Sequence, residues 1–273
     1  EKLNTIRGFK ELSPEEYMEI LRFITFQSER TELSKTKIKQ ATQQMVEMIM
    51  KPLMKSDKNL MKNVSAEDID KLKISNPSDF LYSILLSLIS NILLSDLIPV
   101  ILINKTDKDF IFSDNPVVLY NPTYDNGNNS FRGFQSPALL VFCPMSSNKC
   151  LMLFDSEYYN IIVDKNNFHY ITDPNEILKI NRLQFHNCLD NIYYGSQSQK
   201  DVVDNLSKDF FSKYKKEEQL ALTKTAKHVS DPHRELVIFS SRGIPEKILF
   251  SFLKYGKMKT RTPLMRNKRI CDL

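Results

Sequence analysis

The chain is poor in residues that interrupt, cross-link or loosen a fold. It has only six glycines and twelve prolines among 273 residues, which argues against long flexible linkers and low-complexity disorder. Its four cysteines contain no C-x-x-C pair, so neither a disulfide framework nor a cysteine zinc site is indicated. We therefore expect an ordered globular protein in a reducing, cytoplasmic environment.

Signals for export and membrane insertion are also lacking. The N-terminal sequence EKLNTIRGFKEL carries charges where a secretory signal needs an apolar core, and it lacks an initiator Met, which suggests a fragment or a processed chain. Residues 80–104 come nearest to a membrane span, but Asp96 and Pro99 interrupt them. Their uncharged part, residues 80–95, is shorter than the roughly 20 residues needed to cross. We expect a buried helix followed by a strand, and no membrane partner.

Helical signals dominate residues 1–96. Ser13, Pro14 and Glu16 have the spacing of a capped helix start, and apolar residues follow at helical intervals. A second amphipathic helix is predicted over about residues 35–54. The sequence SAEDIDKL indicates a further helix start.

Residues 97–172 change to short β-rich runs. LIPVILIN and DFIFSD flank KTDKD and predict one hairpin, while ALLVFCP and CLMLFD flank MSSNK and predict a second. VVLYN and FHYIT add two more expected strands. Because these connections are too short for parallel crossovers, we predict a mostly antiparallel sheet.

Residues 173–273 return to helices with one further strand. Asp173 and Pro174 begin a helix that we expect to end just before Gly195. We also expect a helix over residues 201–219, a strand in RELVIFSS, and a last helix over residues 244–259. Helices, strands and then helices predict a single α+β domain spanning residues 1–273.

The polar insert Ser113–Pro116, within FIFSDNPVVLYNP, has two interpretations. In the first it is only a turn, because Asp and Asn side chains bond their own backbone and Asn115 precedes a proline. In the second, Asp114 projects from a strand end into a cleft, where it acts as a base or binds a hard cation. Both interpretations stay open at the level of sequence.

Two neighbouring segments offer further polar groups. Ser146 and Lys149 would approach Asp114 if the two predicted hairpins are neighbours, and otherwise they form an ordinary polar loop tip. Arg30 could clamp a phosphate or carboxylate, or pair with an acid of its own domain.

The helix after Asp173 has two polar faces. Asn181, Gln184 and Cys188 share one face, where Asn181 lies between apolar neighbours and must find hydrogen-bond partners if it is buried. Arg182, His186 and Asp190 share the other face, which we interpret as a solvated charged stripe.

Two C-terminal segments suggest metal or nucleic-acid binding. His228, Asp231 and His233 are three metal-ligand types within six residues, although scattered loop histidines are common. Residues 254–269 carry basic side chains and no acid, so they either bind nucleic acid or another anionic surface, or form a solvated tail.

Three sequence blocks together resemble a bacterial family known as domain of unknown function 4238. The blocks are DFIFSDNPVVLYNP, LLVFCPMSSNKCLMLFD and ILKINRLQFHNCLDNIYYGS. FITFQSERT is similar to the family's helix with F-x-x-x-Q-x-x-R-T, so the resemblance covers about residues 15–196. The family's upstream H-x-x-P-x-x-Y-L segment has no match in this chain. The matching site positions are Gln27, Arg30, Ser113, Asp114, Asn115, Pro116, Ser146 and Asn181.

The resemblance implies that the protein acts in bacterial defence against phage. This is a biological setting, and it does not identify a chemical reaction. One hypothesis is a nucleic-acid-acting, nuclease-like effector that uses a divalent metal. Its catalytic residues would be Asp114, Arg30 and Ser113, and its substrate-binding residues would be Gln27, Asn115, Ser146, Lys149 and Asn181. The alternative is a non-catalytic sensor whose cleft binds a small ligand or a protein partner.

Overall fold

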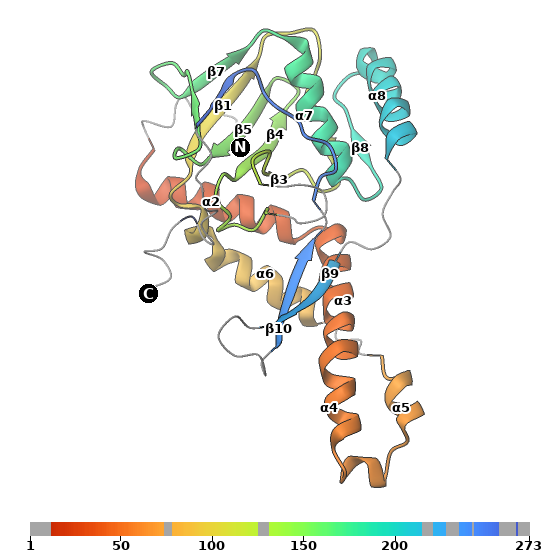
Figure 1. Ribbon diagram of the computed structural model, residues 1–273. Coiled ribbons are helices and arrows are strands. Elements are labelled where there is room, and N and C mark those ends of the chain that lie inside the picture. Colours follow the sequence, from red (N-terminus) through yellow and green to blue (C-terminus); the bar gives the residue numbers. More distant parts are fainter. Residues whose placement is uncertain are drawn as a thin grey trace.

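The computed structural model describes residues 12–73, 78–124, 131–214, 221–227, 235–241, 243–256 and 266. Its architecture is α+β, as predicted, with helices on both faces of a central sheet (Figure 1). Helices precede the sheet strands in the N-terminal part and return after them in the C-terminal part.

The central sheet has five strands in the order β3-β4-β5-β1-β7. The strands are β1 (Ile98–Asn104), β3 (Val118–Tyr120), β4 (Leu140–Ser146), β5 (Lys149–Phe154) and β7 (Phe168–Ile171). All neighbours are antiparallel except β1 and β7, which run parallel. The parallel pair is permitted because three other strands of the sheet lie between β1 and β7 along the chain.

Three two-stranded sheets complete the β structure. They pair β2 (Phe112–Ser113) with β8 (Ile192–Tyr193), β6 (Tyr159–Ile161) with β11 (Leu253–Tyr255), and β9 (Ala221–Lys227) with β10 (Glu235–Ser241). The strand predicted in RELVIFSS is therefore confirmed, whereas its partner β9 was not predicted.

One predicted hairpin is wrong and the other is confirmed. The runs LIPVILIN and DFIFSD do not pair, because β1 pairs with β5 and β7 while β2 pairs with β8. The second hairpin is β4 and β5, which pair as far as Ser146 and Lys149 and leave Ser147 and Asn148 as the turn.

Burial on both faces explains why the strands are continuously apolar. In β4, Leu140 and Phe142 pack against helix α7 (Pro174–Asn187) and residues 244–253, whereas Val141 and Cys143 face α2 (Pro14–Glu29). A sheet covered on both faces needs apolar side chains at successive positions and not at alternate ones.

The N-terminal helices follow their predicted starts. Ser13 caps α2 in a capping box with Glu16. The second helix is longer than predicted and runs over residues 32–56 as α3 (Glu32–Met45), the π-helical turn η2 (Val46–Met50) and α4 (Lys51–Ser56). The wide turn η2 lies directly before Pro52, which has no N–H for the regular helical pattern.

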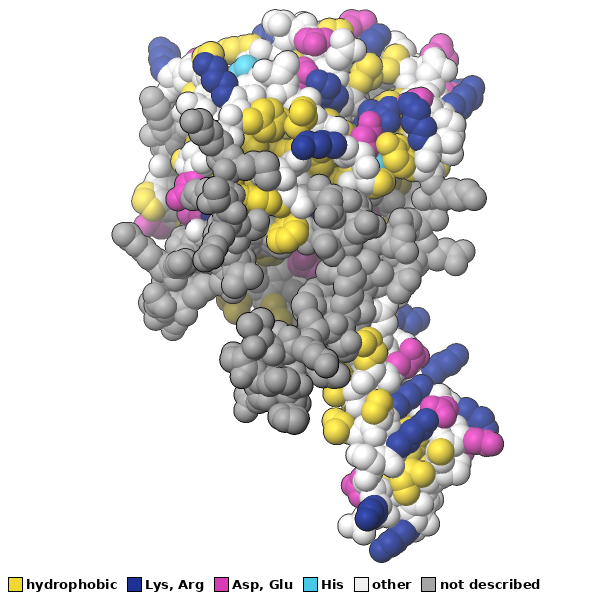
Figure 2. Space-filling view, in the orientation of Figure 1, with side chains coloured by type: hydrophobic (Ala, Val, Ile, Leu, Met, Phe, Trp, Pro, Cys, Tyr) yellow, Lys and Arg dark blue, Asp and Glu magenta, His cyan; other side chains and the backbone are white. Residues whose placement is uncertain are grey.

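The end of this long helix forms an arm, defined here as residues 46–71, that projects from the body (Figure 1). It contains η3 (Leu60–Lys62) and α5 (Ala66–Lys71), which begins at the predicted cap Ser65. Lys55 binds the Asp70 carboxylate at 2.7 Å and so ties α5 to α4. Figure 2 shows apolar and charged side chains mixed along the arm, and Leu53 is 63% exposed.

Helix α6 (Ser78–Ser90) does not match the predicted buried helix. Ser87 is buried, and its carbonyl accepts a hydrogen bond from the Thr25 hydroxyl of α2 at 2.7 Å. Leu81, Leu85 and Ile89 are 60–68% exposed, so α6 packs through one face only. It continues as η4 (Asn91–Leu94) into β1. Among the described helices, none combines the length and the apolar character that crossing a membrane requires.

The C-terminal part departs most from prediction. Helix α7 ends at Asn187 and not near Gly195, and it is followed by η5 (Gln197–Gln199) and α8 (Lys200–Lys213). The predicted last helix is wrong, because residues 243–252 are irregular. The Tyr120 hydroxyl bonds both backbone groups of Ile248, and the buried Glu176 carboxylate accepts from the Ser251 N–H. These bonds replace the bonds of a helix.

Candidate functional site

Asp114 fastens the loop that follows α7. Its Oδ1 accepts from the backbone N–H of Leu189 at 2.8 Å, and its Oδ2 accepts from those of Asp190 and Asn191 at 2.7 and 3.0 Å. The Asp114 N–H in turn donates to the Asn191 carbonyl at 3.0 Å. Both carboxylate oxygens are therefore occupied by backbone groups of the same chain.

Three side-chain amides of α7 hold the chain before and after Asp114. We call Asn181, Gln184 and Asn187 the amide face, because their i, i+3, i+6 spacing places them on one side of the helix. Each bonds two backbone groups of residues 109–117 at 2.7–3.1 Å. The amide face thus takes the place of a neighbouring strand and explains why β2 does not pair with β1.

Ser113 belongs to the same network. Its side chain is buried, and its hydroxyl lies 2.8 Å from both the Asn115 carbonyl and Gln184 Oε1. Its N–H donates to Gln184 Oε1 at 3.0 Å. The N–H and the hydroxyl of Ser113 are thus both bonded within the fold.

Asn115 is different from its two neighbours. Only 6% of the residue is exposed, and its side-chain Oδ1 is buried without a hydrogen-bond partner in the structure. An unpaired buried acceptor costs about 1 to 3 kcal/mol, and among the described residues no other fully buried side-chain N or O atom lacks a hydrogen-bond partner.

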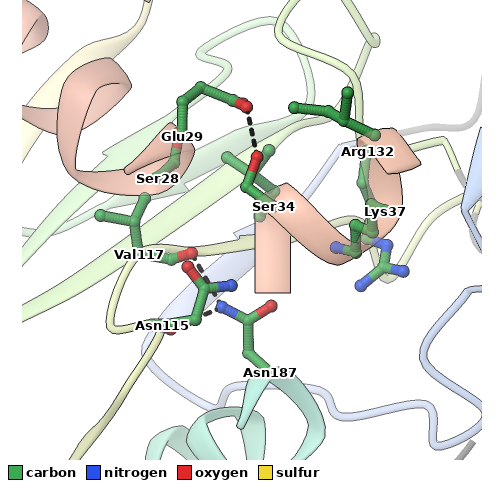
Figure 3. A pocket seen from close by; sticks show the side chains of 10 residues that line it. Ser28, Glu29, Ser34, Lys37, Asn115, Val117, Arg132 and Asn187 are labelled. Carbon is green, nitrogen blue, oxygen red and sulfur yellow. Dashed lines mark hydrogen bonds between the residues drawn. The ribbon is translucent and has the colours of Figure 1, made fainter. Parts of the chain in front are cut away.

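A pocket of about 200 Å³ opens beside Asn115 (Figure 3). Residues of α2 and α3 form one side of the pocket, and residues of the segment 115–119 together with Asn187 form the other. The lining residues are Ser28, Glu29, Ser34, Lys37, Ile38, Asn115, Val117, Leu119, Arg132 and Asn187. The volume lies below the roughly 300 to 1,000 Å³ that is usual for drug-sized ligands, so the pocket suits a small molecule.

The tight turn between α2 and α3 builds the helical side of the pocket. Thr31 caps α3 by accepting from the Ser34 N–H at 3.2 Å, and its hydroxyl lies 3.2 Å from the Ser28 carbonyl. This turn brings the end of α2 back beside the start of α3. The Glu29 carboxylate consequently accepts from the Ser34 hydroxyl at 2.6 Å.

Two cationic side chains face the amides across the pocket. Figure 3 shows Lys37 and Arg132 on one side and Asn115 and Asn187 on the other. Burial, and to a lesser extent the Arg132 charge, lower the pKa of Lys37 to about 8, although the Glu29 carboxylate acts in the opposite direction. In the described part of the chain, no hydrogen bond or ion pair engages the Lys37 ammonium.

The predicted site residues are divided between the pocket and its surroundings. Asn115 lines the pocket, while Ser113, Asp114 and Asn181 belong to the network beside it. The other predicted residues are not among those that line it, namely Gln27, Arg30, Ser146 and Lys149.

These four residues lie at the end of α2 and at the two strand positions that flank the β4–β5 turn. Arg30 Nε bonds Gln27 Oε1 at 2.6 Å at the end of α2, next to the pocket residues Ser28 and Glu29. Ser146 and Lys149 face each other across the β4–β5 turn, where the Ser146 hydroxyl donates to Asn148 Oδ1 at 2.8 Å.

The second polar face of α7 is not the predicted solvated stripe. Arg182 binds Asp209 at 2.6 Å and Glu246 at 2.9 Å, and His186 Nε2 lies 3.3 Å from Glu246. Only 5% of the His186 side chain is exposed, because α8 and the segment that contains Glu246 cover this face. Burial lowers the pKa of His186 to about 4, although Glu246 acts in the opposite direction.

The two C-terminal predictions fall largely outside the described residues. This holds for His228, Asp231 and His233, and for most of residues 254–269. The residues that are described contain no group of three or more His, Cys, Asp or Glu side chains placed to hold a metal. The Arg266 side chain is 3% exposed and binds Asp96 at 2.8 Å, so its guanidinium is engaged within the fold.

Sequence reasoning missed Lys37, Ser34, Asn187 and Arg132. Ser34, Lys37 and Ile38 lie on the side of α3 that faces the pocket. A lysine at helical spacing between such residues is a sequence signal for a functional cation. Asn187 continues the amide spacing set by Asn181 and Gln184. No local pattern marks Arg132.

Comparison with known proteins gives one result. The family model for "Protein of unknown function (DUF4238)" matches residues 3–198, a range that contains all ten pocket residues and the whole amide face. No curated protein and no solved structure matches the chain.

Proposed function

This chain belongs to the DUF4238 family, and from the pocket within the family region we propose that it is a non-catalytic domain that binds a small molecule with an anionic group. The observation that carries the proposal is the combination of the Lys37 ammonium, the nearby Arg132 guanidinium and the unpartnered Asn115 acceptor in one small pocket. The setting we propose is the bacterial defence implied by the family resemblance.

An anion fits the charges of the pocket. Lys37 has lost part of its hydration and lies near a second cation, and both effects disfavour its charged form. A bound carboxylate or phosphate would favour the charged form of Lys37 through a charge-assisted hydrogen bond. The Glu29 carboxylate also raises the pKa of Lys37, and it already accepts a hydrogen bond from the Ser34 hydroxyl.

The occupied groups of Asp114 favour binding over catalysis. To act as a base or a metal ligand, Asp114 would have to release backbone N–H groups of residues 189–191. Ser113 would likewise have to leave Gln184. Two pocket groups require no such change, since among the described residues the Lys37 ammonium and the Asn115 Oδ1 have no hydrogen-bond partner.

The position of the pocket suits a sensor. Ser34, Lys37 and Ile38 lie on α3, the helix that continues into the arm, whereas Asn115 and Arg132 belong to the body. A ligand that contacts both sides would hold the base of the arm against the body. Binding could therefore change the population of arm positions, provided that the ligand prefers one of them.

The experiment is a calorimetric titration of the full chain with inorganic phosphate and with propionate at pH 7. We expect binding of at least one anion, and we expect Lys37→Met to weaken it at least tenfold. Lys35→Met is the matched control, because Lys35 lies on the same helix, is exposed and pairs only locally with Glu32. Equal binding by the wild type and Lys37→Met, or no binding by the wild type, would contradict the proposal.

A further inference from the structure

The pocket offers groups of two opposite kinds. Lys37 and Arg132 supply hydrogen-bond donors with positive charge. Asn115 Oδ1 and the Glu29 carboxylate supply acceptors. A simple anion would use only the donors and would leave the buried acceptor of Asn115 unpaired.

The unpaired acceptor sets a requirement on the ligand. Asn115 is 6% exposed, and the described residues give its Oδ1 no donor. A ligand that fills the pocket removes the remaining access to water, so it gains most if it brings its own N–H group. A cationic ammonium makes the strongest hydrogen bond of this kind and is also attracted by Glu29.

The rest of the pocket limits the size of the ligand. Ile38, Val117 and Leu119 form an apolar part of the lining, which can take a short aliphatic group. The volume of about 200 Å³ leaves room for little beyond one carboxylate, one ammonium and such a group.

We propose that the ligand is a free α-amino acid, with its carboxylate at Lys37 and Arg132 and its ammonium at Asn115 Oδ1 and Glu29. This inference rests on the proposed function, because it assigns the anionic group of that ligand to a carboxylate. It adds the neighbouring ammonium, which the proposed function does not require.

Matched ligand pairs test the ammonium directly. Alanine is compared with propionate, and valine with isovalerate, by calorimetry on the full chain at pH 7. Each pair differs only in the amino group. We expect each amino acid to bind at least tenfold more tightly than its partner acid, and we expect inorganic phosphate to compete with both.

Variants at Asn115 test whether this residue causes the preference for an amino acid over the matched acid. Asn115→Leu removes the acceptor and should reduce the alanine-to-propionate preference to less than threefold, whereas Asn115→Asp keeps an acceptor and should preserve at least a tenfold preference. Thermal unfolding shows whether each variant is folded. If Asn115→Leu does not fold, the wild-type ratios and Asn115→Asp still decide the question.

The outcomes separate this inference from the proposed function. If propionate or phosphate binds in a Lys37-dependent way but neither amino acid binds better than its partner acid, the inference is wrong and the proposed function stands. An unchanged preference in folded Asn115→Leu would also overturn it. If none of these ligands binds, both proposals fail together.

Discussion

The amide face and the adjoining pocket are neighbouring polar regions that differ in how many of their polar groups are hydrogen-bonded. On the amide face, Asn181, Gln184 and Asn187 each bond two backbone groups of residues 109–117. In the pocket, Asn115 Oδ1 and the Lys37 ammonium have no hydrogen-bond partner in the described part of the chain. The bonded amides of the amide face fix the backbone of residues 109–117, whereas the unbonded groups of the pocket are available to a ligand.

The segment Ser113–Pro116 lies on the boundary between these regions. Ser113 and Asp114 are bonded within the fold, while the Asn115 side chain lines the pocket. The turn and site interpretations of the sequence thus apply to different residues of the same segment. Three variants or conditions test this division, and they are ordered by expected effect on stability.

Gln184→Leu should have the largest effect. Gln184 is fully buried, and its loss leaves the Ser113 N–H and the Pro116 carbonyl without their partner. We expect a loss of about 3 to 5 kcal/mol in the free energy of unfolding, measured with urea. Gln43→Leu is the control, because within the described residues the Gln43 side chain bonds only the exposed Glu47, and it should change stability by less than about 0.5 kcal/mol. A similar small change for Gln184→Leu would contradict a structural role.

Acid should destabilise the protein through His186. Its pKa is about 4 when folded and near 6.5 when unfolded, so only the unfolded state binds the proton between these values. Stability should fall as the pH decreases from about 6.5 towards 4, by at most about 3 kcal/mol. Asp209, whose pKa is lowered below 3.8 by Lys213 and Arg182, loses its contribution only at lower pH.

His186→Gln isolates this contribution. The variant should show a flatter dependence of unfolding free energy on pH between 4 and 6.5. His169→Gln provides the control, because His169 lies on the edge strand β7 and bonds the Ile162 carbonyl, away from this network. An equally steep dependence in His186→Gln would assign the acid sensitivity to other groups.

Asp114→Asn should have a smaller effect that is confined to stability. Asparagine has one oxygen for the three N–H groups that Asp114 binds, and its NH2 group faces donors. We expect a loss of about 2 kcal/mol in thermal or urea unfolding. The affinity for propionate should remain within twofold of the wild type. A stable Asp114→Asn protein that no longer binds would place Asp114 in the site.

Local signals predicted the elements whose bonds are local. The capping box of Ser13 and Glu16 and the β4–β5 hairpin both depend on residues close in sequence. The partner of β2 could not be predicted in this way, since its backbone bonds side chains about seventy positions later. Residues 244–252 have the apolar spacing of a helix, but Tyr120 and Glu176 bind their backbone from distant parts of the chain.

The candidate site shows the same limit. Asn115 was predicted because it stands in a polar insert between two apolar runs. Lys37 lies on the side of α3 that faces the pocket. It can be recognised as a site residue only when the residues opposite this side of α3 are known. Arg132 reaches the pocket from a loop without a sequence pattern, so only the fold brings the two cations together.

The most direct test of anion binding in the pocket is a crystal structure of the full chain soaked with propionate. We predict a bound carboxylate at Lys37 and Arg132, with Asp114 still bound to the N–H groups of residues 189–191. A pocket that stays unoccupied at a propionate concentration that saturates the protein in solution, or a ligand held by Asp114 instead, would contradict it.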